Sequence, residues 1–86
     1  MNWQADITKT REAHLRAVLA EYARDWHLVI RDYLYCLEAA ERAGDVRAVG
    51  FFAAKLAAAY RAIGLGEKAQ RYGELAAAAQ NKAARK

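Results

Sequence analysis

The sequence predicts an all-α fold, a small three- to four-helix bundle with a long central helix. About a quarter of the 86 residues are Ala and none is Pro, and these two residues have the highest and the lowest helix propensity. Val, Ile and Thr, which favour strands, are few. The densest apolar segment runs from Trp26 to Leu37. Because it is apolar nearly all round, we expect neighbours to cover it on more than one side; its main stripe is Trp26, Val29, Tyr33, Cys36 and Ala40.

The length fits one domain, residues 1–86, with no room for a second. The longest apolar tract, Val46 to Leu65, is interrupted by three basic residues, so it does not predict a membrane span. No signal segment follows Met1, and the single Cys36 falls on the core stripe, where a buried, inert thiol is expected. These features together predict a cytoplasmic protein.

Residues 1–10 form an N-terminal segment in which Trp3 and Ile7 are the apolar anchors. These two side chains either fold back onto the bundle, which we favour, or dock on a partner.

Residues 11–43 are predicted to form a long or bent helix. The apolar residues leading into the central segment recur at heptad spacing: Leu15, Leu19, Tyr22 and Trp26. One alternative is a single rod from about residue 8 to Ala43, roughly 50 Å long. The other is two helices that break at Arg24-Asp25, although no Gly or Pro enforces a break there. The unbroken stripe favours the rod, and a rod that protrudes beyond its neighbours suggests a homodimer.

The next helix is predicted over residues 46–63, because Gly44 suits the left-handed end of a helix and Asp45 suits an N-cap. Gly50 lies inside this helix, where it lowers helix stability by about 1 kcal/mol relative to Ala. A Gly inside a helix usually allows a neighbouring helix to approach closely. We expect Ala39, Ala40 or Ala43 to lie opposite Gly50. The predicted core face is Val49, Phe52, Leu56, Ala59, Tyr60 and Ile63.

The last helix is predicted over residues 67–80, after a turn at Gly64-Leu65-Gly66. Its apolar face is shallow: Ala69, Tyr72, Leu75, Ala76 and Ala79. Residues 81–86 are a basic tail that should fray, since it has little to bury.

Residues Ala53 to Lys82 resemble a tetratricopeptide-type helical hairpin. The residues that carry the resemblance, at or one place from the repeat positions, are Leu56, Tyr60, Gly64, Ala69, Tyr72 and Ala76. The chain departs from the pattern where such repeats prefer Trp, Gly, an aromatic residue and Pro, at Ala53, Ala57, Gly73 and Lys82. No second copy occurs 34 residues away, so a repeat array is not predicted.

Alanine-rich helices joined by Gly-Asp and Gly-Leu, as in Glu38 to Leu65, also resemble in composition the helical parts of phage small terminase subunits, which are DNA-binding oligomers. Both resemblances imply binding and assembly rather than catalysis.

The residue types needed for catalysis are sparse. The sequence has no Ser, and Cys36 has no evident base nearby. His14 and His27 are too far apart for a helical pair of metal ligands, and zinc needs three or four donors. No phosphate-binding loop occurs. We therefore expect no enzyme activity, no cofactor and no metal.

Two surfaces remain as candidates for binding. The first combines Leu and Tyr with charged residues, as protein-binding hot spots do: Arg24, Leu28, Arg31, Tyr35 and Glu38. The alternative is that the N-terminal segment or the last helix covers Leu28 and Tyr35. The second is basic with one aromatic ring: Arg47, Phe51, Lys55, Arg61 and Arg71. It could contact phosphate and stack on a base, lie on an anionic membrane surface, or be a solvated helix face.

Charge is unevenly distributed along the chain. Residues 1–45 hold six Lys/Arg and eight Asp/Glu, a net of −2, and residues 46–86 hold eight Lys/Arg and two Asp/Glu, a net of +6. The leading hypothesis is a small helical adaptor or inhibitor that binds another protein, and the small size of the chain suggests a phage or mobile-element protein. A nucleic-acid-binding oligomer that uses residues 46–86 is the second hypothesis, and a structural homo-oligomeric bundle is the third.

Overall fold

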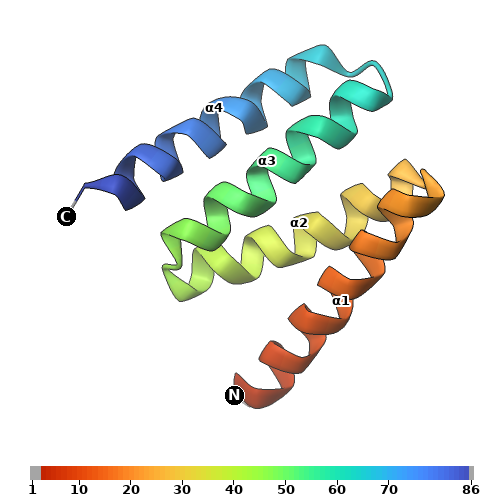
Figure 1. Cartoon of the computed structure of the whole chain (residues 1–86). Coiled ribbons are helices and arrows are strands. Elements are labelled where there is room, and N and C mark those ends of the chain that lie inside the picture. The colour runs from red at the N-terminus through yellow and green to blue at the C-terminus, as the bar shows by residue number, and fades with distance from the viewer. Residues whose placement is uncertain (1–2, 86) are drawn as a thin grey trace.

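The protein is a stack of four α-helices, described for residues 3–85 by a computed structural model (Figure 1). The helices are α1 (Trp3–Ala23), α2 (Trp26–Ala43), α3 (Val46–Ala62) and α4 (Gly66–Ala84). The described residues contain no strand, which confirms the all-α class. Backbone contacts join only consecutive helices, α1 to α2, α2 to α3 and α3 to α4. The helices therefore form the small all-α bundle that the sequence predicts, in which each helix packs on its neighbours in the chain.

The single rod over residues 8–43 is wrong, because the chain breaks between α1 and α2. Arg24 has φ +57°, the left-handed conformation, and is the one non-Gly residue of the described chain with positive φ. Asp25 then caps α2 by accepting a hydrogen bond from the N–H of Leu28. The structure has the second alternative, two helices, and neither inner helix is unusually long: α2 has 18 residues and α3 has 17.

All three turns are built in the same way. The N–H of the left-handed residue donates to the carbonyl three positions back, and the next N–H donates to the carbonyl five positions back. This is the Schellman arrangement. The left-handed residues are Arg24, Gly44 and Gly64, spaced 20 residues apart. The predicted helix ends at Gly44 and Gly64 are confirmed, and the unpredicted one uses Arg in the place of Gly.

The core lies along α2, which α1 and α3 cover on two sides. Its largest fully buried side chains are Val29, Tyr33 and Cys36 of α2 and Leu56 of α3. Trp26 is only partly buried. The buried position predicted for Cys36 is confirmed.

The face of α1 that packs on α2 is made of small side chains. Its buried residues are Ala13, Ala17 and Ala20, whose small side chains allow close approach of the two helices. The apolar residues at heptad spacing are instead exposed, with relative accessibilities of 61% for Leu15, 59% for Leu19 and 86% for Tyr22. The heptad stripe is real, but it faces away from the core.

Helix α4 packs on α3 through small residues and stacked rings. A Cβ on Gly50 would lie 3.5 Å from the Cβ of Ala79, so its close neighbour is α4 and not the predicted Ala39, Ala40 or Ala43. The rings of Tyr60 and Tyr72 stack with their centroids 5.4 Å apart. Helix α4 continues to Ala84 rather than ending at Gln80; Lys86, the end of the predicted tail, lies outside the described residues.

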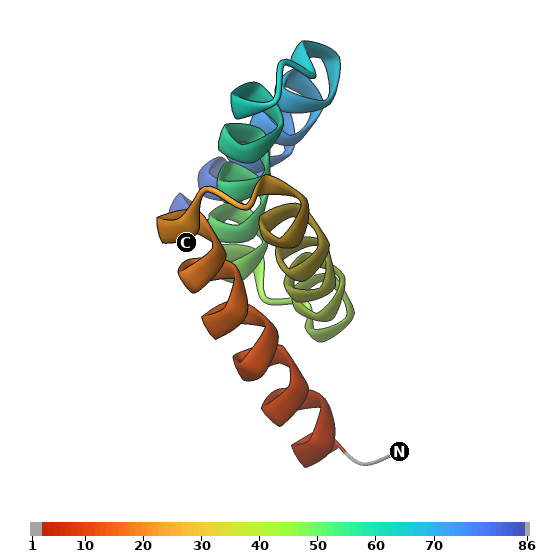
Figure 2. The same cartoon turned by 90° about the vertical axis from the view of Figure 1, so that its right-hand side faces the viewer.

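Helix α1 begins at Trp3, so most of the N-terminal segment is helical. The side chain of Trp3 lies outside the described residues, whereas Ile7 is 41% exposed. Figures 1 and 2 show the N-terminal end of α1 pointing away from α3 and α4. Among residues 3–85, no helix combines the length and apolar character needed to cross a membrane.

Candidate docking surface

The exposed stripe of α1 holds the three most exposed large apolar side chains of the described residues. Leu15, Leu19 and Tyr22 follow one another at spacings of four and three, so they lie on one side of the helix. Each is more than half exposed. The sequence predicts the heptad spacing of these residues but not that they lie on the surface, opposite the face of α1 that packs on α2. The signal that could have separated the two faces is the row of alanines at positions 13, 17 and 20, which offers the closer approach.

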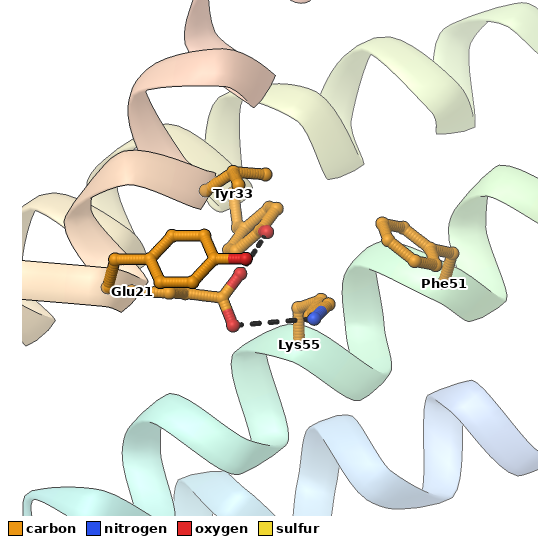
Figure 3. Close-up of a pocket in the computed structure, with 6 residues that line it drawn as sticks. Glu21, Tyr33, Phe51 and Lys55 are labelled. Carbon is orange, nitrogen blue, oxygen red and sulfur yellow. Dashed lines mark hydrogen bonds and ion pairs between the residues drawn. The ribbon is translucent and has the colours of Figure 1, made fainter. Parts of the chain in front are cut away.

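A recess beside this stripe separates α1 from α3 (Figure 3). It has a volume of about 290 Å³. This volume lies at the lower end of the range of about 300–1,000 Å³ that is usual for ligand pockets, and it is large enough to take one protruding side chain of a partner. Its lining residues are Val18, Glu21 and Tyr22 of α1, Tyr33 of α2, and Phe51 and Lys55 of α3.

Glu21 is the centre of the polar wall of the recess. Its carboxylate accepts a hydrogen bond from the hydroxyl of Tyr33 and pairs with Lys55, whose Nζ lies 3.3 Å from Oε2 (Figure 3). Burial, followed by the hydrogen bond to Glu21 and its negative charge, raises the pKa of Tyr33. The hydroxyl of Tyr33 therefore keeps its proton and donates a hydrogen bond to the carboxylate. The charged groups of Glu21 on α1 and Lys55 on α3 are therefore paired with each other within the molecule.

An aromatic cluster joins the same two helices nearer the start of α3. The ring of His14 lies 5.7 Å from that of Phe51 and 5.2 Å from that of Phe52, centroid to centroid. The Nζ of Lys55 is 5.6 Å from the centre of the Phe51 ring. Phe51 is nevertheless 46% exposed. It contributes one apolar edge of the recess, opposite the stripe of α1.

The predicted protein-binding residues of α2 lie on the side of that helix away from the core. Leu28 is 37% exposed and Tyr35 is 36% exposed, and α4 does not contact α2, so α4 does not cover them. Arg24 is in the turn before α2. Arg31 pairs with the buried Asp32, as does Arg16 of α1, each at 3.4 Å. Glu38 is exposed. The apolar side chains of this surface, Leu28 and Tyr35, are less exposed than those of the α1 stripe.

The predicted basic residues are dispersed. Arg47 and Arg61 are exposed near opposite ends of α3, about 21 Å apart along the axis at 1.5 Å per residue. Lys55 is committed to Glu21, and Arg71 lies on α4. Between Val46 and Gly66 there is no acidic residue, so the exposed face of α3 is positively charged, although fewer of its cations are unpaired than predicted.

A second hollow lies near the start of α1, but its chemistry is unreactive. It measures about 480 Å³ between α1, α2 and α3, with Cys36 in its wall. The thiol contacts the carbonyl of Thr10 at 3.6 Å. Burial, and then the negative charge of Asp32, raises the pKa of Cys36 to about 11. A thiol that stays protonated is a poor nucleophile. Among residues 3–85, no three His, Cys, Asp or Glu side chains gather as metal ligands would.

Comparison with protein-family models, with curated proteins and with solved structures finds no match for this chain. The geometry of its own residues is therefore the basis for assigning a function. The tetratricopeptide-type hairpin over residues 53–82 and the likeness to small terminase subunits stay predictions.

Proposed function

We propose that this protein is a non-enzymatic helical binding module, an adaptor or inhibitor, that docks on another protein through the α1 stripe of Leu15, Leu19 and Tyr22. The observation that supports the proposal is the exposure of these three large side chains on one side of one helix. Large contiguous apolar patches on the surface of a protein mark interaction sites.

The energetics favour a protein partner. Burying a side chain of this size contributes about 1.5–3 kcal/mol when it goes from full exposure to full burial. The three residues are already held on a helix whose other face is packed against α2, so little conformational entropy is lost when a partner covers them. Tyr is among the residue types enriched in binding hot spots.

The proposal is tested by affinity capture from the native host, followed by mass spectrometry. The test variant is Leu15→Asp with Leu19→Asp, and the matched control is Leu28→Asp with Tyr35→Lys on α2. Circular dichroism establishes that both remain helical. We expect the α1 variant to lose the captured partner and the α2 variant to keep it. Equal capture by all three proteins, or loss by the α2 variant alone, would contradict the proposal.

A second candidate function is nucleic-acid binding through α3, and the absence of acidic residues between Val46 and Gly66 favours it. Exposed Arg47 and Arg61 would contact phosphates, and Phe51 would stack on a base. Such binding should weaken steeply as salt is added, because counterions are released when phosphates are neutralised. An unchanged mobility of DNA and RNA at low salt would exclude this candidate.

A further inference from the structure

We infer that α1 is a lid that opens as a unit while α2, α3 and α4 stay folded, and that the thiol of Cys36 becomes accessible only when this lid is open. The inference does not depend on the proposed function, because it concerns how α1 is held to the core and not what binds its outer stripe. Arg24 and Asp25 are the hinge, since they alone join α1 to α2. Hinges are commonly a few residues at the end of an element.

Helix α1 contributes little apolar surface to the core. Its buried residues are Ala13, Ala17 and Ala20, each of which carries a single methyl group. Among residues 3–85, the larger apolar side chains that pack partly buried against the core all come from the chain after α1. Helix α4 also buries alanines, but it adds Tyr72 and Leu75 to that set. Because hydrophobic stabilisation grows with the apolar area buried, α1 is the helix that this effect holds least strongly.

Polar contacts supply much of the remaining attachment of α1, and they lie in its second half. Arg16 pairs with the buried Asp32 of α2 at 3.4 Å. Glu21 accepts a hydrogen bond from Tyr33 of α2 and pairs with Lys55 of α3 at 3.3 Å. Water can replace each of these partners when α1 moves away, so each contact adds only modestly to the stability of the closed form.

The first half of α1 packs loosely, because the hollow of about 480 Å³ lies beneath it, between α1, α2 and α3. The α1 wall of this hollow is formed by Ile7, Thr10 and Arg11. Figures 1 and 2 show this end of α1 pointing away from α3 and α4. A helix interface of native density leaves few voids larger than a water molecule. Segments with few buried apolar contacts are those that open locally, so both halves of α1 favour opening.

Cys36 lies under α1 and reports on its position. Its side chain is fully buried, and the thiol donates to the carbonyl of Thr10 on α1, with 3.6 Å between the sulfur and the oxygen. Burial raises the pKa of this thiol to about 11, which keeps it protonated and unreactive in the closed form. When α1 opens, the thiol meets water and becomes accessible to reagents. The chain has one Cys, so modification by a thiol reagent measures the open form without ambiguity.

The test measures the rate at which an excess of an aromatic disulfide reagent modifies Cys36 in the native full chain. The population that is globally unfolded, taken from urea unfolding, sets the rate expected without a lid. We expect modification about tenfold faster than that rate, or more. The rate should also rise only weakly with urea, because opening exposes only the surface under α1. A rate no faster than global unfolding allows would overturn the inference.

Two lysines offer a matched pair of variants. The Nζ of Lys55 lies 5.6 Å from the centre of the Phe51 ring and that of Lys68 lies 5.5 Å from the centre of the Tyr60 ring, but of the two only Lys55 also pairs with α1. Lys55→Met should raise the modification rate about two- to fivefold, and Lys68→Met should leave it unchanged. Arg16→Met should raise it about tenfold, because a charged partner of a buried carboxylate is lost. Equal rates in the two lysine variants, or no acceleration by Arg16→Met, would contradict the lid.

Hydrogen exchange gives a measurement that does not use Cys36. The amides of α1 between Arg11 and Ala20 should exchange about tenfold faster than the most protected amides of α2 and α3. Tyr72→Leu removes the stacked ring between α3 and α4, so it lowers the global stability and should leave the exchange of α1 unchanged. If α1 and α2 are equally protected, or if Tyr72→Leu accelerates both to the same extent, α1 opens only when the whole molecule unfolds and the inference fails.

Discussion

Replacing Arg24 with Gly should stabilise the protein, because Arg24 ends α1 in the left-handed conformation at φ +57°. For a residue with a Cβ this conformation costs about 1–2 kcal/mol, and Gly avoids that cost. Gly also gives the unfolded chain more freedom, which offsets roughly 0.5–1 kcal/mol. We expect a net gain of up to about 1.5 kcal/mol in the free energy of unfolding.

The matched control is the same substitution within a helix. Arg71 lies on the exposed side of α4, where Gly is less favourable than an ordinary helix former by about 0.8 kcal/mol. The two Arg→Gly variants should therefore change stability in opposite directions. In urea unfolding, a change of 1 kcal/mol moves the midpoint by roughly 0.5–1 M at a slope of about 1–2 kcal/mol per M. The thermal midpoint should shift by about 4–8 °C per kcal/mol.

The result also decides between the two arrangements that the sequence allows for residues 11–43. In a continuous rod, Gly at position 24 would be an interior helix residue and would destabilise as much as Gly at position 71. Loss of stability in both variants, by similar amounts, would refute the left-handed turn at Arg24 and with it the separation of α1 from α2.

Three further predictions concern the core and α4. Burial raises the pKa of Cys36 from 9.0 to about 11, so between these pH values the folded state keeps a proton that the unfolded state releases. The free energy of unfolding is therefore at its full value below pH 9 and should fall by about 2–3 kcal/mol as the pH rises to 11. Urea unfolding of Cys36→Ala should show a smaller fall across that range. Tyr33→Phe removes the hydrogen bond to Glu21 and should lower the free energy of unfolding by about 1.5–3 kcal/mol; an unchanged urea midpoint would contradict that bond. Gly73→Ala should raise the free energy of unfolding by about 1 kcal/mol, because nothing lies within 4 Å of the added Cβ, and thermal unfolding measures it.

Local chemistry explains the helix ends that the sequence predicted. Gly44 adopts φ +69° and Asp45 accepts a hydrogen bond from the N–H of Ala48, as residues of these types do at such positions. The turn at Arg24-Asp25 has the same form, and the sequence contains a signal for it: Ala-Arg-Asp at 23–25 recurs as Ala-Gly-Asp at 43–45. The sequence favours the rod over this turn because the heptad stripe is unbroken and neither Gly nor Pro enforces a break at Arg24-Asp25.

The sequence by itself determined the all-α class, the ends of the later helices and the burial of Cys36, because these depend on propensity, capping and residue type over a few positions. The tertiary structure decided which face of α1 is inside. Both the alanine row and the leucine row of α1 have helical periodicity. Periodicity shows that a set of residues shares one face of a helix, but it does not show what that face contacts. The alanine row packs on α2 because small side chains let the two helices approach closely. This packing leaves three large apolar side chains on the surface, beside the basic face of α3: Leu15, Leu19 and Tyr22. The surface that we propose for binding therefore depends on which face of α1 packs against α2.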